Sequence, residues 1–466
     1  MRRWTTPAVF LVIALVAGGL GVRSAAAQPP PASHAEGPQL ATPVLSPRRV
    51  PELVTQTLAD GRLKAGLDLA FVAPALEKSK SCLVVEVGPR RLYERDATLP
   101  LIPASTLKVF TGVAALERLG PNGRYATEAR LDPQGRLWLV GSGDPVLATP
   151  DFAATAREQP QVFTNLASLA SDIIDTVGLQ AIPGGVWGDE SRYDSQRYLP
   201  SWPTSYASTN QIGPVSALTV NDGFATYGAR VVPAPAPALN AAEVLANLLR
   251  ARGAMVGPSG TGVAPADAQK VAAVASPTVT EIVGQMLRVS ENLTAELLVK
   301  EMGKRFGTGG TWTAGTEVVR ATLADSGFAG TGMVFADGSG LDRSDRLSCD
   351  LLSAALDRLE PAGPIASGLP VAGRTGTLAG RFLGNPAAGR LRAKTGSLNY
   401  VSGLVGFVDT PAGAIEFSLL ANDLPDPAAR GRLLQDQVGA VLAAYPNSPA
   451  AADLAPLPPA PPPPPA

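Results

Sequence analysis

The stretch PASTLKVFTGVAALERLG, residues 103–120, combines a serine and a lysine three positions apart with a strongly apolar run. The proline near its start and the glycine at its end favour a helix over 105–119. Positions i and i+3 share a helix face, so we expect the Ser105 hydroxyl close to the Lys108 amine. A desolvated lysine can lose its proton near neutral pH and accept one from a serine. Taken alone, the tetrapeptide is better explained by an N-cap serine beside a solvated lysine.

Two later motifs favour the catalytic interpretation of Ser105 and Lys108. S-E-N at 290–292 falls at a break between helical stretches and supplies a second hydroxyl and an amide. K-T-G at 394–396 stands at the head of an expected strand, where a lysine and a threonine can bind a carboxylate and glycine allows close backbone approach. No other S-x-x-K or K-[ST]-G occurs in the chain. The order S-x-x-K, S-x-N, K-T-G is the signature of penicillin-interacting serine enzymes.

Composition excludes other chemistries. The single histidine, His34, lies in a Pro-rich stretch that we expect to be extended. A Ser-His-Asp triad and a His-ligated zinc site are therefore unavailable, and the sequence predicts neither a metal nor a cofactor. The net charge of −1 gives no reason to expect a nucleic-acid partner.

The chain ends are expected to lie outside the folded part. Residues 1–27 have a basic start, an apolar run and an A-A-A site, which predicts a cleaved secretory signal and an extracytoplasmic protein, secreted or periplasmic, at the cell wall. An uncleaved membrane anchor remains the alternative, whereas no stable membrane insertion is expected after cleavage. Residues 28–50 read as a Pro-rich linker, and 446–466 as a disordered Pro-rich tail that favours polyproline II.

Between these ends, hydrophobic periodicity predicts strands and helices. Period-2 alternation and turn residues mark strands in 81–101, 135–147 and 390–423, with two strands in the first segment and three in the last. Period-3.6 patterns mark helices in 167–179, 241–253, 277–307, 313–326, 346–359 and 431–445.

The resemblance to a known family is now close. PLIPASTLKVFTGVAALERLG, GSGDPVL, PVSALTVNDG, RVSENLTAELLVK, DGSGLDRSDRLS and GTLAGRFLGNPAAGRLRAKTGSLNYVSGLVGFV resemble the class C low-molecular-mass penicillin-binding proteins. These are the D-alanyl-D-alanine carboxypeptidases/endopeptidases of peptidase family S13, and the likeness covers about 52–445.

The resemblance implies an α/β (α+β) fold. Its main part is a serine β-lactamase/transpeptidase-like domain, an antiparallel sheet flanked by helices. Ser105 and Ser290 are 185 residues apart, an interval that in the family holds inserted smaller, β-rich domains. We therefore expect the first part of the main domain at 51–130, the inserted domains at 131–275 and the second part at 276–445.

The resemblance also implies catalytic roles. Ser105 attacks the carbonyl between the last two D-alanines, and Lys108 is the base for that step. Ser290 relays a proton to the leaving amine, while Asn292 holds the substrate amide and the lysine. The expected activity is that of a serine-type D-Ala-D-Ala carboxypeptidase, a hydrolase.

Substrate contacts are implied for the K-T-G strand. Lys394 and Thr395 bind the terminal carboxylate, and Gly396 gives the substrate room. The oxyanion lies between the backbone N–H groups of Ser105 and Ser397.

Two further residue pairs are open to two interpretations. Asp189 and Tyr193 resemble the family's pocket for the free amine of a diamino acid, but an ordinary turn residue and a half-buried ring fit them equally. Cys82 and Cys349 are the only cysteines of an exported chain, so they form one disulfide or two buried thiols.

The expected partners are peptidoglycan peptides and β-lactams. A β-lactamase-like hydrolase and a non-catalytic wall-binding protein are the alternatives. The balance of carboxypeptidase and endopeptidase activity, the preferred diamino acid and the oligomeric state are left open.

Overall fold

The structure is a computed structural model, and it describes residues 42–43, 46–72, 76, 78–156, 158–176, 178, 180–328, 332–359 and 363–456. The signal predicted at 1–27 lies outside these residues, as do most of the 28–50 linker and residues 457–466 of the tail. The described residues form two compact units, one within 1–55 and 449–466 and one within 56–448. Within the described part, no helix is long and apolar enough to cross a bilayer.

The smaller unit contributes two 3₁₀ helices, η1 (Pro47–Arg49) and η8 (Ala451–Leu454), and the first residues of helix α2 (Pro51–Ala70). The other elements belong to the larger unit.

Its main sheet has five antiparallel strands in the order β14-β15-β16-β1-β2. Their bounds are β1 Lys80–Val87, β2 Arg90–Arg95, β14 Leu391–Leu398, β15 Val401–Thr410 and β16 Gly413–Asn422. The two strands predicted at 81–101 and the three at 390–423 are confirmed. Because β1 pairs with β16, the beginning and the end of the fold lie side by side.

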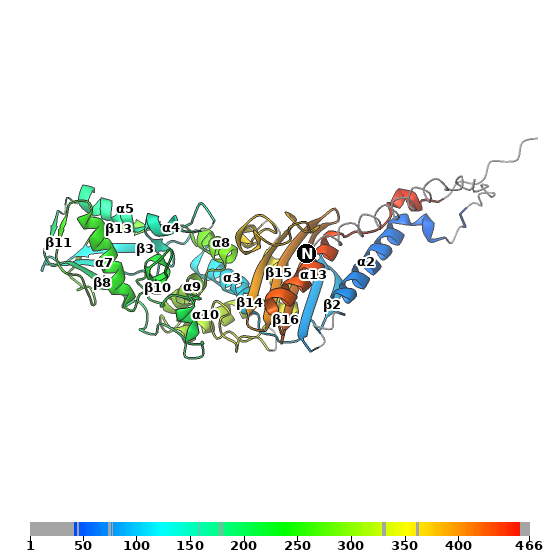
Figure 1. The fold of residues 1–466 in the computed structure, drawn as a ribbon, viewed down its shortest axis with the longest axis horizontal. Helices are drawn as coiled ribbons and strands as arrows, with labels where there is room; N and C mark the ends of the chain where they lie inside the picture. Colours follow the sequence, from blue (N-terminus) through cyan, green and yellow to red (C-terminus); the bar gives the residue numbers. More distant parts are fainter. Residues whose placement is uncertain are drawn as a thin grey trace, which may run out of the picture. The chain divides into compact units, whose positions relative to one another are not determined.

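Both faces of this sheet are buried. Successive residues of a strand point to opposite faces, and the middle of β1, residues 82–85, is apolar and buried at every position. Val84 belongs to the hydrophobic core that contains α11 (Cys349–Leu359), while Leu83 belongs to the core that contains α2 and α13 (Arg432–Ala443). The sheet is therefore the middle layer between two sets of helices, and Figure 1 shows α13 across one face.

A cluster of helices packs beyond α11 in the same core. Its members are α3 (Lys108–Leu119), α8 (Val279–Val289), α9 (Asn292–Phe306), α10 (Trp312–Asp325) and α12 (Pro364–Gly368). The helices predicted in 277–307, 313–326 and 346–359 are confirmed. The helix expected over 105–119 differs at its start, because Ala104–Leu107 form a 3₁₀ helix, η3, and the α-helix begins at Lys108. The α+β fold class is confirmed.

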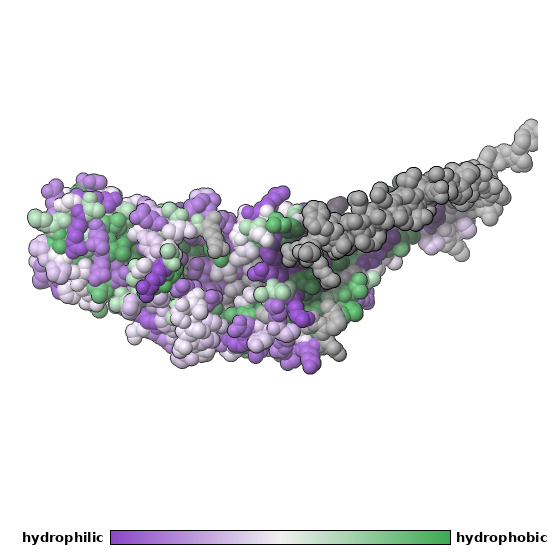
Figure 2. Space-filling model, in the orientation of Figure 1, coloured by the Kyte–Doolittle hydropathy of each residue, from purple (hydrophilic) through white to green (hydrophobic). Residues whose placement is uncertain are grey.

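A second five-stranded sheet is formed by residues between α3 and α8. Its order is β12-β8-β4-β3-β13, and it mixes parallel and antiparallel pairs. The bounds are β3 Ala126–Leu131, β4 Leu137–Val140, β8 Val186–Asp189, β12 Gly260–Thr261 and β13 Gln269–Ala275. The helices α5 (Leu166–Ser171) and α7 (Pro237–Arg250) share its core. On the face drawn in Figure 2, hydrophilic and hydrophobic residues are mixed over this sheet.

Short elements complete the segment. They are β5 Leu147–Ala148, β6 Thr164–Asn165, β7 Ala181–Ile182, β9 Phe224–Thr226, β10 Val232–Pro233, β11 Met255–Val256, α4 Pro150–Ala153, α6 Ser205–Ser208, the 3₁₀ helix η5 Asn221–Gly223 and the π-helical η4 Asp172–Thr176. Two single turns outside the segment are the 3₁₀ helix η6 Gly376–Leu378 and the π-helical η7 Pro427–Gly431. The boundary predicted at residue 131 falls inside this sheet, since β3 begins at Ala126; the domain limits stay a prediction.

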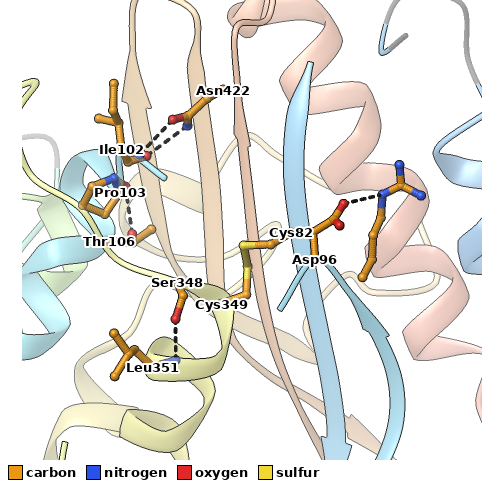
Figure 3. Close-up of a disulfide and its surroundings, with 10 residues drawn as sticks. Cys82, Asp96, Ile102, Pro103, Thr106, Ser348, Cys349, Leu351 and Asn422 are labelled. Carbon is orange, nitrogen blue, oxygen red and sulfur yellow. Dashed lines mark hydrogen bonds and ion pairs between the residues drawn. A yellow bond between two sulfur atoms is a disulfide. The ribbon is translucent and has the colours of Figure 1, made fainter. Parts of the chain in front are cut away.

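A disulfide joins the main sheet to the helical cluster. Cys82 on β1 and Cys349 at the start of α11 are bonded, with their Cα atoms 5.8 Å apart (Figure 3). Both residues are fully buried. The bond links positions 267 residues apart, so it closes a very long loop in the unfolded chain.

We expect the double variant Cys82→Ala/Cys349→Ala to lose about 3–5 kcal/mol of unfolding free energy, because a cross-link over a long loop restricts the unfolded ensemble. Urea denaturation followed by circular dichroism would measure the loss. Wild-type protein with a reducing agent is the matched control and should shift in the same direction. An unchanged urea midpoint in the double variant would contradict the expectation.

Candidate active site

Ser105 lies on η3 at the junction between the helical cluster and the main sheet. The preceding residue, Ala104, has a φ of 48°, in the left-handed region. Gly340, with a φ of +79°, packs directly against it, since a Cβ at position 340 would lie 2.0 Å from the Ala104 carbonyl oxygen. The Thr106 hydroxyl donates to the Pro103 carbonyl at 2.8 Å. These contacts fix the η3 turn and thereby the position of Ser105.

The end of β16 holds the segment that leads into η3. The Asn422 Oδ1 accepts a hydrogen bond from the Ile102 N–H at 2.8 Å, and its Nδ2 donates to the Ile102 carbonyl at 3.1 Å (Figure 3). On the neighbouring strands two glycines face η3: a Cβ at Gly396 would lie 2.7 Å from the Pro103 carbonyl oxygen, and one at Gly403 would lie 2.9 Å from the Thr106 methyl carbon. The sheet can approach the serine turn this closely only without side chains at these positions.

Lys108 is fully buried one turn beyond the serine. Its Nζ donates to the Ser105 Oγ at 2.9 Å, to the Asn292 Oδ1 at 2.7 Å and to the Ser339 carbonyl at 2.7 Å. These three acceptors match the three N–H donors of an ammonium group. The predicted proximity of Ser105 and Lys108 is present, although through a 3₁₀ turn instead of the first turn of an α-helix.

Burial governs the protonation of this lysine. Removal from water lowers the pKa of Lys108 to about 8, against the opposing effect of the Asp337 and Glu296 carboxylates. A lysine with this pKa is partly neutral near physiological pH, so it can accept a proton from the adjacent hydroxyl.

The S-x-N residues come from the junction of two helices. Ser290 ends α8 in the left-handed conformation, with φ 64° and ψ 40°, and Asn292 begins α9. The turn directs the Asn292 side chain to Lys108, and its Nδ2 donates to the Gln211 carbonyl at 2.6 Å. The break predicted between the two helical stretches is confirmed.

Lys394 approaches from the sheet. It is the fourth residue of β14, so its predicted place at the head of the strand is wrong. Its Nζ donates to the Ser290 Oγ and to the Thr395 carbonyl, each at 2.8 Å. Burial, and then the charge of Lys108, lower the pKa of Lys394 well below its usual value. A bound carboxylate would favour the charged form of this lysine.

The side chains after Lys394 lie at an open surface. The Thr395 hydroxyl contacts the Thr377 hydroxyl at 2.9 Å, and Ser397 is exposed. A cavity of about 330 Å³ is lined by Thr377, Thr395, Gly396 and Ser397, together with Arg381 and Arg432 among others. All three motifs therefore meet at one site: Ser105 with Lys108, Ser290 with Asn292, and Lys394 with Thr395.

Sequence reasoning missed the support behind Lys108. Glu296 on α9 is fully buried and accepts hydrogen bonds from the Gly338 and Ser339 N–H groups and from the Trp312 indole at 2.7 Å. It thereby holds the loop whose Ser339 carbonyl binds Lys108. Burial, followed by the nearby Asp337, raises the pKa of Glu296 to about 7. A glutamate on a helix face one turn after Asn292 was the available signal.

Asp189 and Tyr193 make their contacts elsewhere. The Asp189 carboxylate accepts from the Ser191 N–H at 2.9 Å and the Ala264 N–H at 2.8 Å. The buried Tyr193 hydroxyl donates to Glu301 at 2.8 Å. Both contacts fit the structural interpretation, and the amine pocket assigned to these residues stays a prediction.

Comparisons with known proteins point to a single family. The model of the D-Ala-D-Ala carboxypeptidase 3 (S13) family matches residues 63–235 and 228–444. A D-alanyl-D-alanine carboxypeptidase of Actinomadura sp. is 30% identical, covering 82% of this chain and 85% of that protein. A carboxypeptidase of Mycobacterium tuberculosis is 29% identical, covering 86% and 87%.

Solved structures show the same fold. Penicillin binding protein 4 from Haemophilus influenzae superposes with a TM-score of 0.65 at 20% identity, covering 78% of this chain and 95% of that one. The fold and the site define a penicillin-binding type of serine hydrolase. The chain belongs to the D-Ala-D-Ala carboxypeptidase 3 (S13) family, and it is a serine-type D-Ala-D-Ala carboxypeptidase.

Proposed function

We propose that this carboxypeptidase acts on peptidoglycan stem peptides outside the cytoplasm, through an acyl-enzyme on Ser105. The observation that carries the proposal is the buried Lys108 Nζ, 2.9 Å from the Ser105 Oγ. The name of the Actinomadura relative, a D-alanyl-D-alanine carboxypeptidase, supports the substrate.

Acylation begins with proton transfer. Neutral Lys108 takes the proton of the Ser105 hydroxyl while Oγ bonds to the carbonyl carbon of the penultimate D-alanine. The resulting oxyanion lies between the N–H groups of Ser105 and Ser397, donors that typically contribute a few kcal/mol each. Asn292 keeps Lys108 aimed at the hydroxyl through its 2.7 Å contact.

The tetrahedral intermediate then loses the terminal residue. Its C–N bond breaks, and the departing amine receives a proton through the Ser290 hydroxyl, which Lys394 contacts at 2.8 Å. Lys394 and Thr395 hold the terminal carboxylate during this step. Water hydrolyses the remaining ester, with its proton passing back to the Ser105 oxygen, and frees the enzyme.

β-Lactams fit the same scheme. Attack by Ser105 opens the lactam ring, and the acyl group stays attached because the ring amine cannot leave. A solved structure of penicillin binding protein 4 from Haemophilus influenzae in complex with a β-lactam has a similar fold at 19% identity. Rapid turnover of a fluorescent penicillin would instead favour a β-lactamase-like hydrolase.

A defined stem pentapeptide ending in D-Ala-D-Ala tests the proposal. Incubation with the purified protein should release one D-alanine, seen as a mass loss of that residue in mass spectrometry. A cross-linked dimer of two stem peptides in a parallel reaction would reveal endopeptidase activity. An intact pentapeptide, together with a labelled penicillin bound equally well by Ser105→Ala, would support the non-catalytic wall-binding alternative.

A further inference from the structure

A second and larger cavity lies next to β14, the strand that carries Lys394 and Thr395. The two are connected through Thr377, which lines the cavity and whose hydroxyl contacts that of Thr395. The cavity measures about 850 Å³ and shares Thr377 with the smaller cavity at Thr395. Glu291, the residue between Ser290 and Asn292, also lines it. Its remaining lining comes mainly from the α4 segment and the loop around η6, including Phe152, Ala153, Glu158, Arg374, Gly376 and Ala379.

The position of this cavity relates it to one end of the substrate. In the proposed mechanism the leaving residue carries the terminal carboxylate, so it lies against Lys394 and Thr395. The Thr395 hydroxyl contacts the Thr377 hydroxyl at 2.9 Å, and Thr377 lines the cavity. Ser290, which serves the leaving amine, precedes Glu291. A side chain on the leaving residue would therefore extend into the cavity, and the methyl group of D-alanine fills only a small part of about 850 Å³.

Over the described residues, the walls of the cavity carry more acid than base. Glu158, Asp222 and Glu291 line it, against Arg374. Glu158 accepts from the Gly376 N–H at 2.7 Å and faces Arg288 at 3.8 Å. A carboxylate oxygen of Glu291 accepts the Leu293 N–H at 3.3 Å.

Asp222 differs from Glu158 and Glu291 in its hydrogen bonding. Among the residues that the structure describes, no group donates a hydrogen bond to its carboxylate. Its backbone is left-handed, with a φ of 53°, and the adjacent Asn221 side chain is anchored to the Thr149 N–H at 2.9 Å. Burial and the nearby Glu291 raise the pKa of Asp222 well above its usual range, which an approaching cation would reverse.

We infer that this cavity is the leaving-group subsite and that Asp222 selects leaving residues with a long, cationic side chain over anionic ones. The inference rests on the proposed function, because it places the leaving residue by the roles of Thr395 and Ser290. The ligand chemistry is an ammonium group at the end of an alkyl chain, which the volume accommodates and the carboxylates attract.

Three acyl peptides that differ only in the leaving residue provide the test: D-Ala–D-Lys, D-Ala–D-Glu and D-Ala–D-Ala. We expect the wild type to cleave the D-Lys peptide with a kcat/KM roughly tenfold above that of the D-Glu peptide, since a charge-assisted contact typically contributes about that factor. Asp222→Asn should reduce this ratio to about a third or less. Asparagine tolerates the left-handed backbone.

Two further variants sharpen the result. Asp267→Asn makes the same chemical change at an exposed position outside the cavity and should leave the ratio unchanged. Ala379→Trp fills the cavity from an exposed position and should slow D-Lys release more than D-Ala release. A wild-type-like ratio in Asp222→Asn would overturn the inference. Full activity in Ser105→Ala would instead overturn the proposed function, so the two failures are distinguishable.

Discussion

The Ser105→Ala variant is expected to lose D-Ala-D-Ala carboxypeptidase activity by about 10⁴-fold or more, because removal of an attacking nucleophile usually leaves only binding and oxyanion stabilisation. The Oγ is half-buried on η3 and lies 2.9 Å from the Lys108 amine. Release of D-alanine from a pentapeptide measures the loss, and a fluorescent penicillin measures acylation on a denaturing gel.

Ser208→Ala is the matched control for this variant. Ser208 belongs to another S-x-N in the chain, is exposed, and donates to the Ser205 carbonyl of its own short helix at 3.1 Å. We expect wild-type labelling in the control and none in Ser105→Ala. Equal labelling of both variants would show that another residue is the nucleophile.

Replacement of Lys108 by methionine is expected to slow acylation by about 10²–10⁴-fold, the usual contribution of a positioned proton acceptor. Methionine keeps the volume of the buried side chain while removing the amine. Because the pKa of Lys108 is lowered to about 8, its neutral fraction grows as pH rises through that value. The wild-type acylation rate should therefore rise between about pH 7 and 9 and then level off, whereas the rate of Lys108→Met should lack this step. Stopped-flow measurements with a labelled penicillin provide the profiles.

Lys108→Arg separates the base role from a purely electrostatic one. A guanidinium group keeps its positive charge but stays protonated at every accessible pH. We expect this variant to be as slow as Lys108→Met, with circular dichroism confirming that both are folded. If the arginine variant recovered most of the rate, a proton-accepting amine would be ruled out.

The parts of the site that depend on short stretches of sequence were predictable. The i, i+3 spacing of Ser105 and Lys108, the helix break before Asn292 and the strand that carries Lys394 all follow from periodicity and turn residues within about fifteen positions. The three motifs were assigned to one site through their order along the chain and the family resemblance, and the hydrogen bonds of Lys108 and Lys394 now connect them.

Long-range features were less accessible to sequence reasoning. Local pattern does not encode that β1 pairs with β16 more than 300 positions later in the chain (Cys82 lies opposite Leu420). The 20-residue helix α2 was missed because its apolar residues form no clear stripe, and only its contact with the sheet reveals which side is buried. Glu296 was missed for a related reason: its partners at 338 and 339 belong to a distant loop.

The two glycines that face the serine turn also limit how this enzyme could escape an inhibitor. Any side chain added at Gly396 would collide with the Pro103 carbonyl at 2.7 Å, pushing β14 away from the turn that it must touch. A larger side chain at Gly396 that excluded a bulky inhibitor would thus also impair the natural reaction. Resistance mutations are therefore expected at positions farther from the serine turn, where a larger side chain does not displace β14.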